Sequence, residues 1–248
     1  MNVQKNIEQL GKQFKAIEKN LATAYSRSEA SEATELITSV LEESLETLPM
    51  LFPLHKISLD LAPGRSGGEQ EHGDIHLYAD PSMKFPNLLR ALPHAIVHEL
   101  GHTVHRQWNP GIFFFNLQEN QHQKLWMQTI LEGVAQEATR EVGYLQSTNF
   151  WPDFINPNED KPGKILASYE AADYEDLVTR VLPDEIADLL YNPPAEQTQE
   201  HAEYFGGKLK AYVLGSFVVS NAVLLGGHDF ADIAQLTPEE FKDIAEKI

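Results

Sequence analysis

The sequence predicts a mostly helical α+β fold with one small antiparallel sheet. Apolar residues recur every three or four positions over most of the chain, which is typical of amphipathic helices. Two short segments, 56–61 and 74–79, instead alternate apolar and polar residues as half-buried strands do. With 248 residues and 42% hydrophobic residues, the chain is long and apolar enough to bury a core.

The first fifty residues are expected to form two helices. One apolar stripe consists of Ile7, Leu10, Phe14, Ile17 and Leu21, and a second helix is predicted over about 32–48. Pro49 and Pro53 end that helix. Residues 1–53 are therefore taken as an N-terminal helical segment, which precedes a main domain over 54–248.

The sheet is expected to be a hairpin. Segment 62–73 separates the two alternating segments and contains four glycines and one proline, which predicts a mobile loop. Two strands around such a loop favour antiparallel pairing.

The rest of the chain is predicted to be helical. Helices are expected over about 87–107, 123–144, 168–191 and 200–225, with an irregular link over 151–164. Pro93 must kink the first of these helices or mark its restart. A last helix is predicted at Thr237-Pro238-Glu239-Glu240, because a cap, a proline and a glutamate occupy the positions of a capping box. The main domain then consists of a sheet with one helix over about 54–110 and a helical half over about 120–248.

Composition excludes several classes of function. Thirty-seven acidic residues against 19 basic ones give a net charge of −18, which disfavours binding to nucleic acid or to anionic membranes. The absence of cysteine excludes disulfides and thiolate chemistry. The N-terminus has no apolar signal core, and the longest apolar stretch, 212–225, is shorter than the roughly 20 residues of a spanning helix. We expect a cytoplasmic protein.

One motif points to metal chemistry: His98-Glu99-Leu100-Gly101-His102. On a helix, residues four apart lie on one face, so His98 and His102 can bind the same ion. Glu99 lies about a hundred degrees around the helix, where it can take a proton from water without being a ligand. Imidazole pairs suit zinc, so Zn²⁺ is the expected cofactor.

A catalytic zinc ion needs a third protein ligand. His105 follows His102 too closely to supply it. The favoured candidate is Glu132, because a carboxylate on a helix suited to burial needs a partner. Glu137 is the rival ligand.

These motifs carry a resemblance to a family. The two histidines followed by Glu132-Gly133-Val134-Ala135 resemble the gluzincin zinc metallopeptidases, and the order of segments over about 54–248 is similar to a bacterial family of zinc-dependent proteases. The resemblance implies a zincin-like fold, with the sheet and the motif helix above, helices below and a cleft between them. It implies His98, His102 and Glu132 as ligands and Glu99 as general base. It also implies an edge strand that holds extended substrate, which 74–79 matches.

Other site residues are less clearly indicated. Gln136 stands where related enzymes often have an acidic residue that orients a ligand histidine. Tyr204 and, less favoured, His201 are candidates to stabilise the oxyanion. Residues that could line the site or simply pack are His72, His76, Tyr78, His94 and 113–115.

The leading expectation is therefore a zinc-dependent peptidase that acts on a peptide or protein substrate. A metal-stabilised scaffold without turnover is the alternative, and hydrolysis of another amide or ester is a third possibility. The sequence leaves the substrate and the oligomeric state open.

Overall fold

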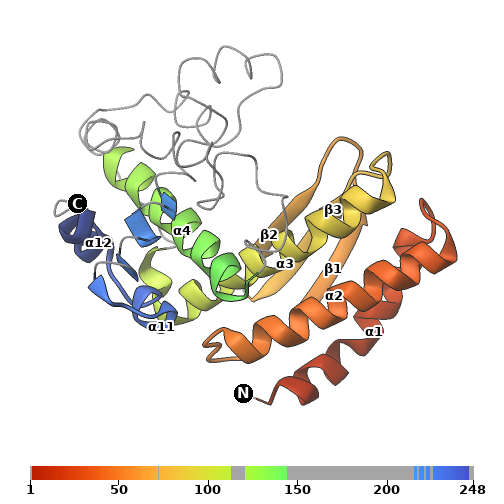
Figure 1. Cartoon of the computed structure of the whole chain (residues 1–248), viewed down its shortest axis with the longest axis horizontal. Coiled ribbons are helices and arrows are strands. Elements are labelled where there is room, and N and C mark those ends of the chain that lie inside the picture. The colour runs from red at the N-terminus through yellow and green to blue at the C-terminus, as the bar shows by residue number, and fades with distance from the viewer. Residues whose placement is uncertain are drawn as a thin grey trace, which may run out of the picture. The chain divides into compact units, whose positions relative to one another are not determined.

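The structure is a computed structural model that describes residues 2–71, 73–112, 121–143, 215–216, 218–220, 222–223 and 226–245 (Figure 1). It is α+β and mostly helical, as the sequence predicts, and its small sheet has three strands. Residue contacts divide the chain into two compact units, Met1–Gln107 with Ala138–Phe150 and Trp108–Glu137 with Trp151–Ile248. No described helix combines the length and apolar character that a membrane crossing requires.

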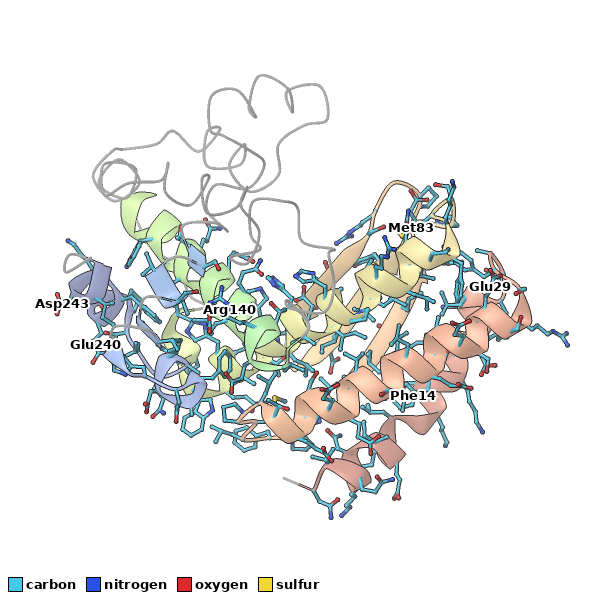
Figure 2. The ribbon with its side chains drawn as sticks, in the orientation of Figure 1. Phe14, Glu29, Met83, Arg140, Glu240 and Asp243 are labelled. Atoms are coloured by element: carbon cyan, nitrogen blue, oxygen red, sulfur yellow. The ribbon has the colours of Figure 1, made fainter. Side chains whose placement is uncertain are left out.

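Two helices open the first unit, α1 (Val3–Leu21) and α2 (Arg27–Thr47). The predicted apolar stripe of α1 is buried, and α1 packs on α2. Helix α2 begins earlier than expected because Ser26 forms a capping box with Glu29, which lies in its first turn (Figure 2). The Ser26 N–H donates to Glu29 Oε2 at 2.9 Å, and the Glu29 N–H donates to Ser26 Oγ at 3.3 Å.

The sheet differs from the predicted hairpin. Its strands are β1 (Lys56–Leu61), β2 (Gly67–Glu71) and β3 (Asp74–Ala79), in the order β1-β3-β2. Strands β1 and β3 run parallel, whereas β2 pairs antiparallel with β3. The predictions of an antiparallel β1–β3 pair and of a loop over 62–73 are therefore wrong.

The physical reason lies in the composition of β2. Its sequence, Gly-Gly-Glu-Gln-Glu, has no apolar alternation that could reveal a strand. The chain reverses after β1 and again at Gly73, whose φ of 88° suits a tight turn. Two reversals leave β1 and β3 pointing the same way, and β3 lies between the other two strands. The expectation that 74–79 is an edge strand is also wrong.

Side-chain amides of α1 cover the outer edge of β1 and of the segment before it. The buried Asn6 amide donates to the Leu54 carbonyl at 2.8 Å and accepts from the Leu54 N–H at 3.0 Å. One heptad later, Gln13 Oε1 accepts from the Ile57 N–H at 2.6 Å, and after another heptad the Asn20 amide donates to the Leu59 carbonyl at 2.9 Å. Seven helical residues rise about 10.5 Å, close to the rise of three strand residues, which matches the step from Leu54 to Ile57; the step from Ile57 to Leu59 is one residue shorter.

Helix α3 (Phe85–Trp108) lies beside the sheet and carries the histidine motif (Figure 1). It continues through Pro93, so the helix does not restart there. Its buried residues include Leu88, Ile96 and Leu100, whose side chains belong to the core of the first unit.

The second unit contains α4 (Gln121–Glu141) as far as Glu137, and α11 (Phe230–Ile233) and α12 (Pro238–Ala245) follow near the end. The Trp126 indole N–H donates to the Pro238 carbonyl at 2.8 Å, which ties α4 to α12. The predicted cap at Thr237 is confirmed, since its N–H donates to Glu240 Oε2 at 2.7 Å and its Oγ1 accepts from the Glu240 N–H at 3.2 Å. The expected link over 151–164, the helix over 168–191 and most of 200–225 lie outside the described residues.

Burial of His105 on α3 predicts an acid-sensitive fold. Desolvation first, and then the charge of His102, lower the pKa of His105 from 6.5 to about 3. As the pH falls, His105 in the unfolded chain is therefore protonated before His105 in the folded protein. The free energy of unfolding keeps its full value above pH 6.5 and decreases between pH 6.5 and pH 3. Within this range the free energy of unfolding decreases by at most about 1.4 kcal/mol per pH unit.

We expect His105→Leu to flatten the pH dependence of the unfolding free energy between pH 6.5 and 5, measured by urea titration of metal-free protein so that metal release does not contribute. Replacement of the exposed His55 by Gln is the matched control and should keep the parental slope. An unchanged slope in His105→Leu would contradict this assignment.

Candidate metal centre

His98 and His102 lie on one face of α3, one turn apart. Their ring centroids are 4.7 Å apart, and the ring planes are nearly perpendicular, at 88°. His98 is buried, whereas His102 is partly exposed. His94, one turn earlier, has its ring 5.7 Å from that of His98. The helical period therefore places three imidazoles along one stripe.

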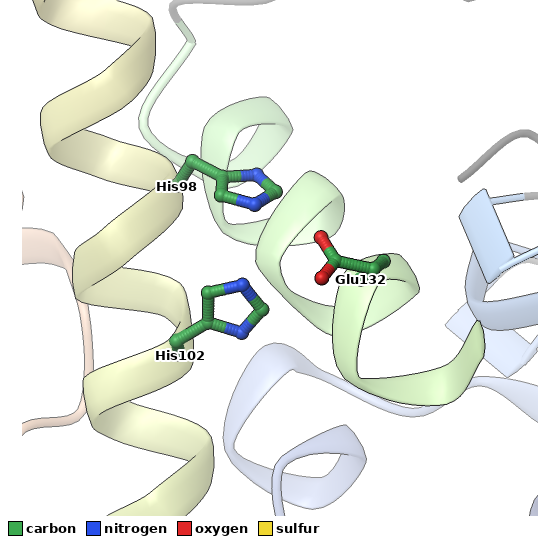
Figure 3. A group of neighbouring side chains, drawn as sticks. All are labelled: His98, His102 and Glu132. Carbon is green, nitrogen blue, oxygen red and sulfur yellow. The ribbon is translucent and has the colours of Figure 1, made fainter. Parts of the chain in front are cut away.

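Glu132 on α4 completes a group of possible metal ligands. One ligand atom from each of His98, His102 and Glu132 lies within 4.8 Å of the other two. Figure 3 shows both imidazole rings directed toward the Glu132 carboxylate. This group could hold a metal ion.

The donor set fits zinc in type. Zinc binds imidazole nitrogen and carboxylate oxygen at about 2.0–2.2 Å in a tetrahedron, which places the donor atoms roughly 3.4 Å apart. The possible ligand atoms of this group lie within 4.8 Å of one another. Three protein donors also match a catalytic site, which leaves one position open.

Glu99 is buried on α3 but does not belong to this group of ligands. Its side chain packs against β2 at Gly68. A Cβ atom at residue 68 would lie 2.7 Å from Glu99 Cγ and 3.1 Å from Glu99 Oε1. A side chain at residue 68 would force Glu99 to shift, so glycine is what allows the Glu99 side chain to pack this closely against β2.

Sequence reasoning missed this role of Gly68. The residue pairs with Leu77 of β3, which is fully buried, so both lie on the face of the sheet toward α3. Adjacent glycines inside a strand signal a close approach of other atoms, and this signal could have revealed the contact.

A second pair of glycines positions Glu132. A Cβ atom on Gly133 would lie 2.3 Å from the Gly215 carbonyl oxygen, and one on Gly215 would lie 2.1 Å from the Thr129 carbonyl oxygen. The backbone of α4 therefore touches the helical segment at Gly215 immediately beside Glu132. This contact explains why glycine follows the glutamate.

The rival ligand Glu137 lies elsewhere on α4. It is buried, and its Oε2 accepts a hydrogen bond from Ser220 Oγ at 3.2 Å. Gln136, one turn after Glu132, is buried as well. His105 is buried and also stands outside the group of ligands.

The remaining candidates fall into two sets. His76 and Tyr78 lie on the face of the sheet opposite Leu77. His76 contacts Ser58 Oγ at 2.5 Å and Asp60 Oδ2 at 3.1 Å. The Tyr78 hydroxyl donates to Glu69. Those outside the described residues are His72, 113–115, His201 and Tyr204.

Comparisons of the chain with protein-family models, curated proteins and solved structures find no match. The chemical interpretation of the site therefore depends on the geometry of its own residues.

The close contact at Gly133 predicts that the same substitution, glycine to alanine, changes stability in opposite directions at residues 133 and 11. Gly133→Ala should destabilise the protein by roughly 1–3 kcal/mol, because its methyl group overlaps the Gly215 backbone. Gly11 on α1 is the matched control, since nothing lies within 4 Å of its Cβ position. Gly11→Ala should stabilise the helix by up to about 1 kcal/mol. Urea unfolding of the two variants measures the difference, and equal effects would refute the close contact.

Proposed function

We propose that this protein is a zinc-dependent hydrolase of peptide bonds, of the gluzincin type that its sequence resembles. The observation that carries the proposal is the ligand group of His98, His102 and Glu132, with Glu99 nearby but outside it. Two histidines, one carboxylate ligand and a separate carboxylate are the parts of a metallopeptidase site.

The chemistry divides between the metal and Glu99. A bound zinc ion supplies Lewis acidity, which polarises a carbonyl group and makes water more acidic. Glu99 accepts a proton from the attacking water and then donates it to the nitrogen of the leaving amine. Its contact with Gly68 supports this role, because a general base must hold its carboxylate in one place.

The proposal also assigns the strand that orients an extended substrate. Strand β3 is central, so this role passes to β2, which is at the edge of the sheet and contacts Glu99 through Gly68. Peptides add to edge strands through main-chain hydrogen bonds.

Replacement of the general base separates binding of the metal from turnover. Glu99→Gln should retain about one zinc ion per chain, because Glu99 is not a ligand, but lose hydrolysis by a factor on the order of 10² or more. Elemental analysis and a fluorogenic peptide-library assay measure the two quantities. Glu46→Gln, an exposed change of the same kind on α2, is the control. Equal cleavage by the parent and Glu99→Gln would reject this mechanism, and retained zinc with no cleavage by the parent would indicate a metal-stabilised scaffold.

Two glutamates of α4 distinguish the third ligand. Glu132→Gln should weaken zinc affinity by at least about tenfold, whereas Glu137→Gln should leave zinc affinity close to the parental value, because Glu137 accepts a hydrogen bond from Ser220. Competition with a chromophoric chelator measures the affinities. The reverse pattern would assign the ligand to Glu137.

A further inference from the structure

The first unit contains a pocket that is distinct from the histidine group. It lies between the last turns of α3, strand β2 and the segment before β1, and its volume is about 260 Å³. Residues that line it include Phe52, Pro53, His55, Gln70, Thr103 and Arg106.

The lining of this pocket is unusual for so acidic a protein. The chain has a net charge of −18, yet the described lining residues include Arg106 and no aspartate or glutamate. Arg106 Nη1 donates to Gln70 Oε1 at 3.4 Å, which orients the guanidinium beside β2. A guanidinium group presents a planar fork of donors that matches a carboxylate, and partial burial strengthens such a pair.

An aromatic wall faces the same space. The Phe52 residue is 60% exposed, which is high for so large an apolar side chain. Its backbone is nevertheless held in place, because Gln107 Oε1 accepts from the N–H groups of Leu51 and Phe52, and Gln107 Nε2 donates to the Phe52 carbonyl. An exposed ring on an anchored backbone, in a pocket that an arginine also lines, suits a ligand that has both an apolar part and a negative charge.

The size and place of the pocket suit one residue of a peptide. Its volume is below the roughly 300–1,000 Å³ of pockets that hold drug-sized ligands. Arg106 follows Glu99 by seven residues on α3, a rise of about 10 Å, which equals about three residues of extended peptide. Along strand β2 the two contact points are two residues apart, with Gly68 at Glu99 and Gln70 at Arg106, so a peptide paired with β2 would have two or three residues between Glu99 and the pocket.

We propose that this pocket binds a carboxylate of the peptide substrate, two or three residues from the bond that is cleaved, through Arg106 with Phe52 as its apolar wall. The inference rests on the proposed function for the statement that the ligand is a peptide. The carboxylate is that of an acidic side chain or that of the peptide's C-terminus.

Peptide binding tests the proposal without turnover. The probes are alanine hexapeptides with Glu or Gln at each position in turn and an amidated C-terminus, and hexa-alanine with a free or amidated C-terminus. Calorimetry measures their affinity for the zinc-loaded Glu99→Gln protein. We expect at least one carboxylate peptide to bind about tenfold more tightly than its neutral partner, and the preference to weaken as salt is added. Preference for Glu at one position identifies a side chain, and preference for the free acid identifies the C-terminus.

Variants of α3 assign the preference to the pocket. Adding Arg106→Gln should abolish the preference for the carboxylate, and Arg106→Lys should retain part of it. Arg90→Gln removes the same charge from an exposed position of the same helix and should change nothing. Urea unfolding of each variant verifies that it is folded. A full preference in Arg106→Gln, or no preference in the parent background, would overturn the proposal.

The two proposals fail in different ways. If the zinc-loaded parent cleaves no peptide but the Arg106-dependent preference persists, the hydrolase assignment fails and the pocket stands. If the parent cleaves Glu and Gln peptides with equal kcat/KM and binds them equally, the pocket assignment fails and the hydrolase stands.

Discussion

The period of one helix sets the arrangement on which the candidate site depends. Because α3 turns once in 3.6 residues, His98 and His102 share a face, while Glu99 points about a hundred degrees away. The same repeat sends the Glu99 side chain into the space above Gly68. The helical period therefore directs the two histidines and Glu99 to different sides of α3.

Close backbone contacts have a similar role on both sides of the site. Gly68 lets a strand approach Glu99, and Gly133 with Gly215 lets two helical segments touch beside Glu132. In each case the missing side chain is the functional feature, since a methyl group would displace its neighbour. Glycine thus allows close packing next to Glu99 and next to Glu132, at the cost of some helix or strand propensity.

Regular patterns in the sequence predict much of this structure. The apolar stripe of α1, the histidine pair and the cap at Thr237 could all be read because each depends on residues close in the chain. Strand β2 could not be predicted from the sequence, because its inward positions are Gly68 and Gln70. These residues contact Glu99 and Arg106 and do not form an apolar face. The parallel pairing of β1 with β3 follows from that unseen strand. The sequence only favoured Glu132 over Glu137 as a ligand, because the position of a carboxylate relative to the histidines depends on tertiary packing, which no local pattern encodes.

The amides of α1 have a consequence for how molecules of this protein meet one another. Asn6, Gln13 and Asn20 occupy donors and acceptors along β1 and the residues before it. A second chain that approached from this side would have to displace a whole helix before it could continue the hydrogen-bond ladder. The β1 edge of the sheet is therefore not available for pairing with a strand of another molecule, which disfavours aggregation through β1 at high protein concentration.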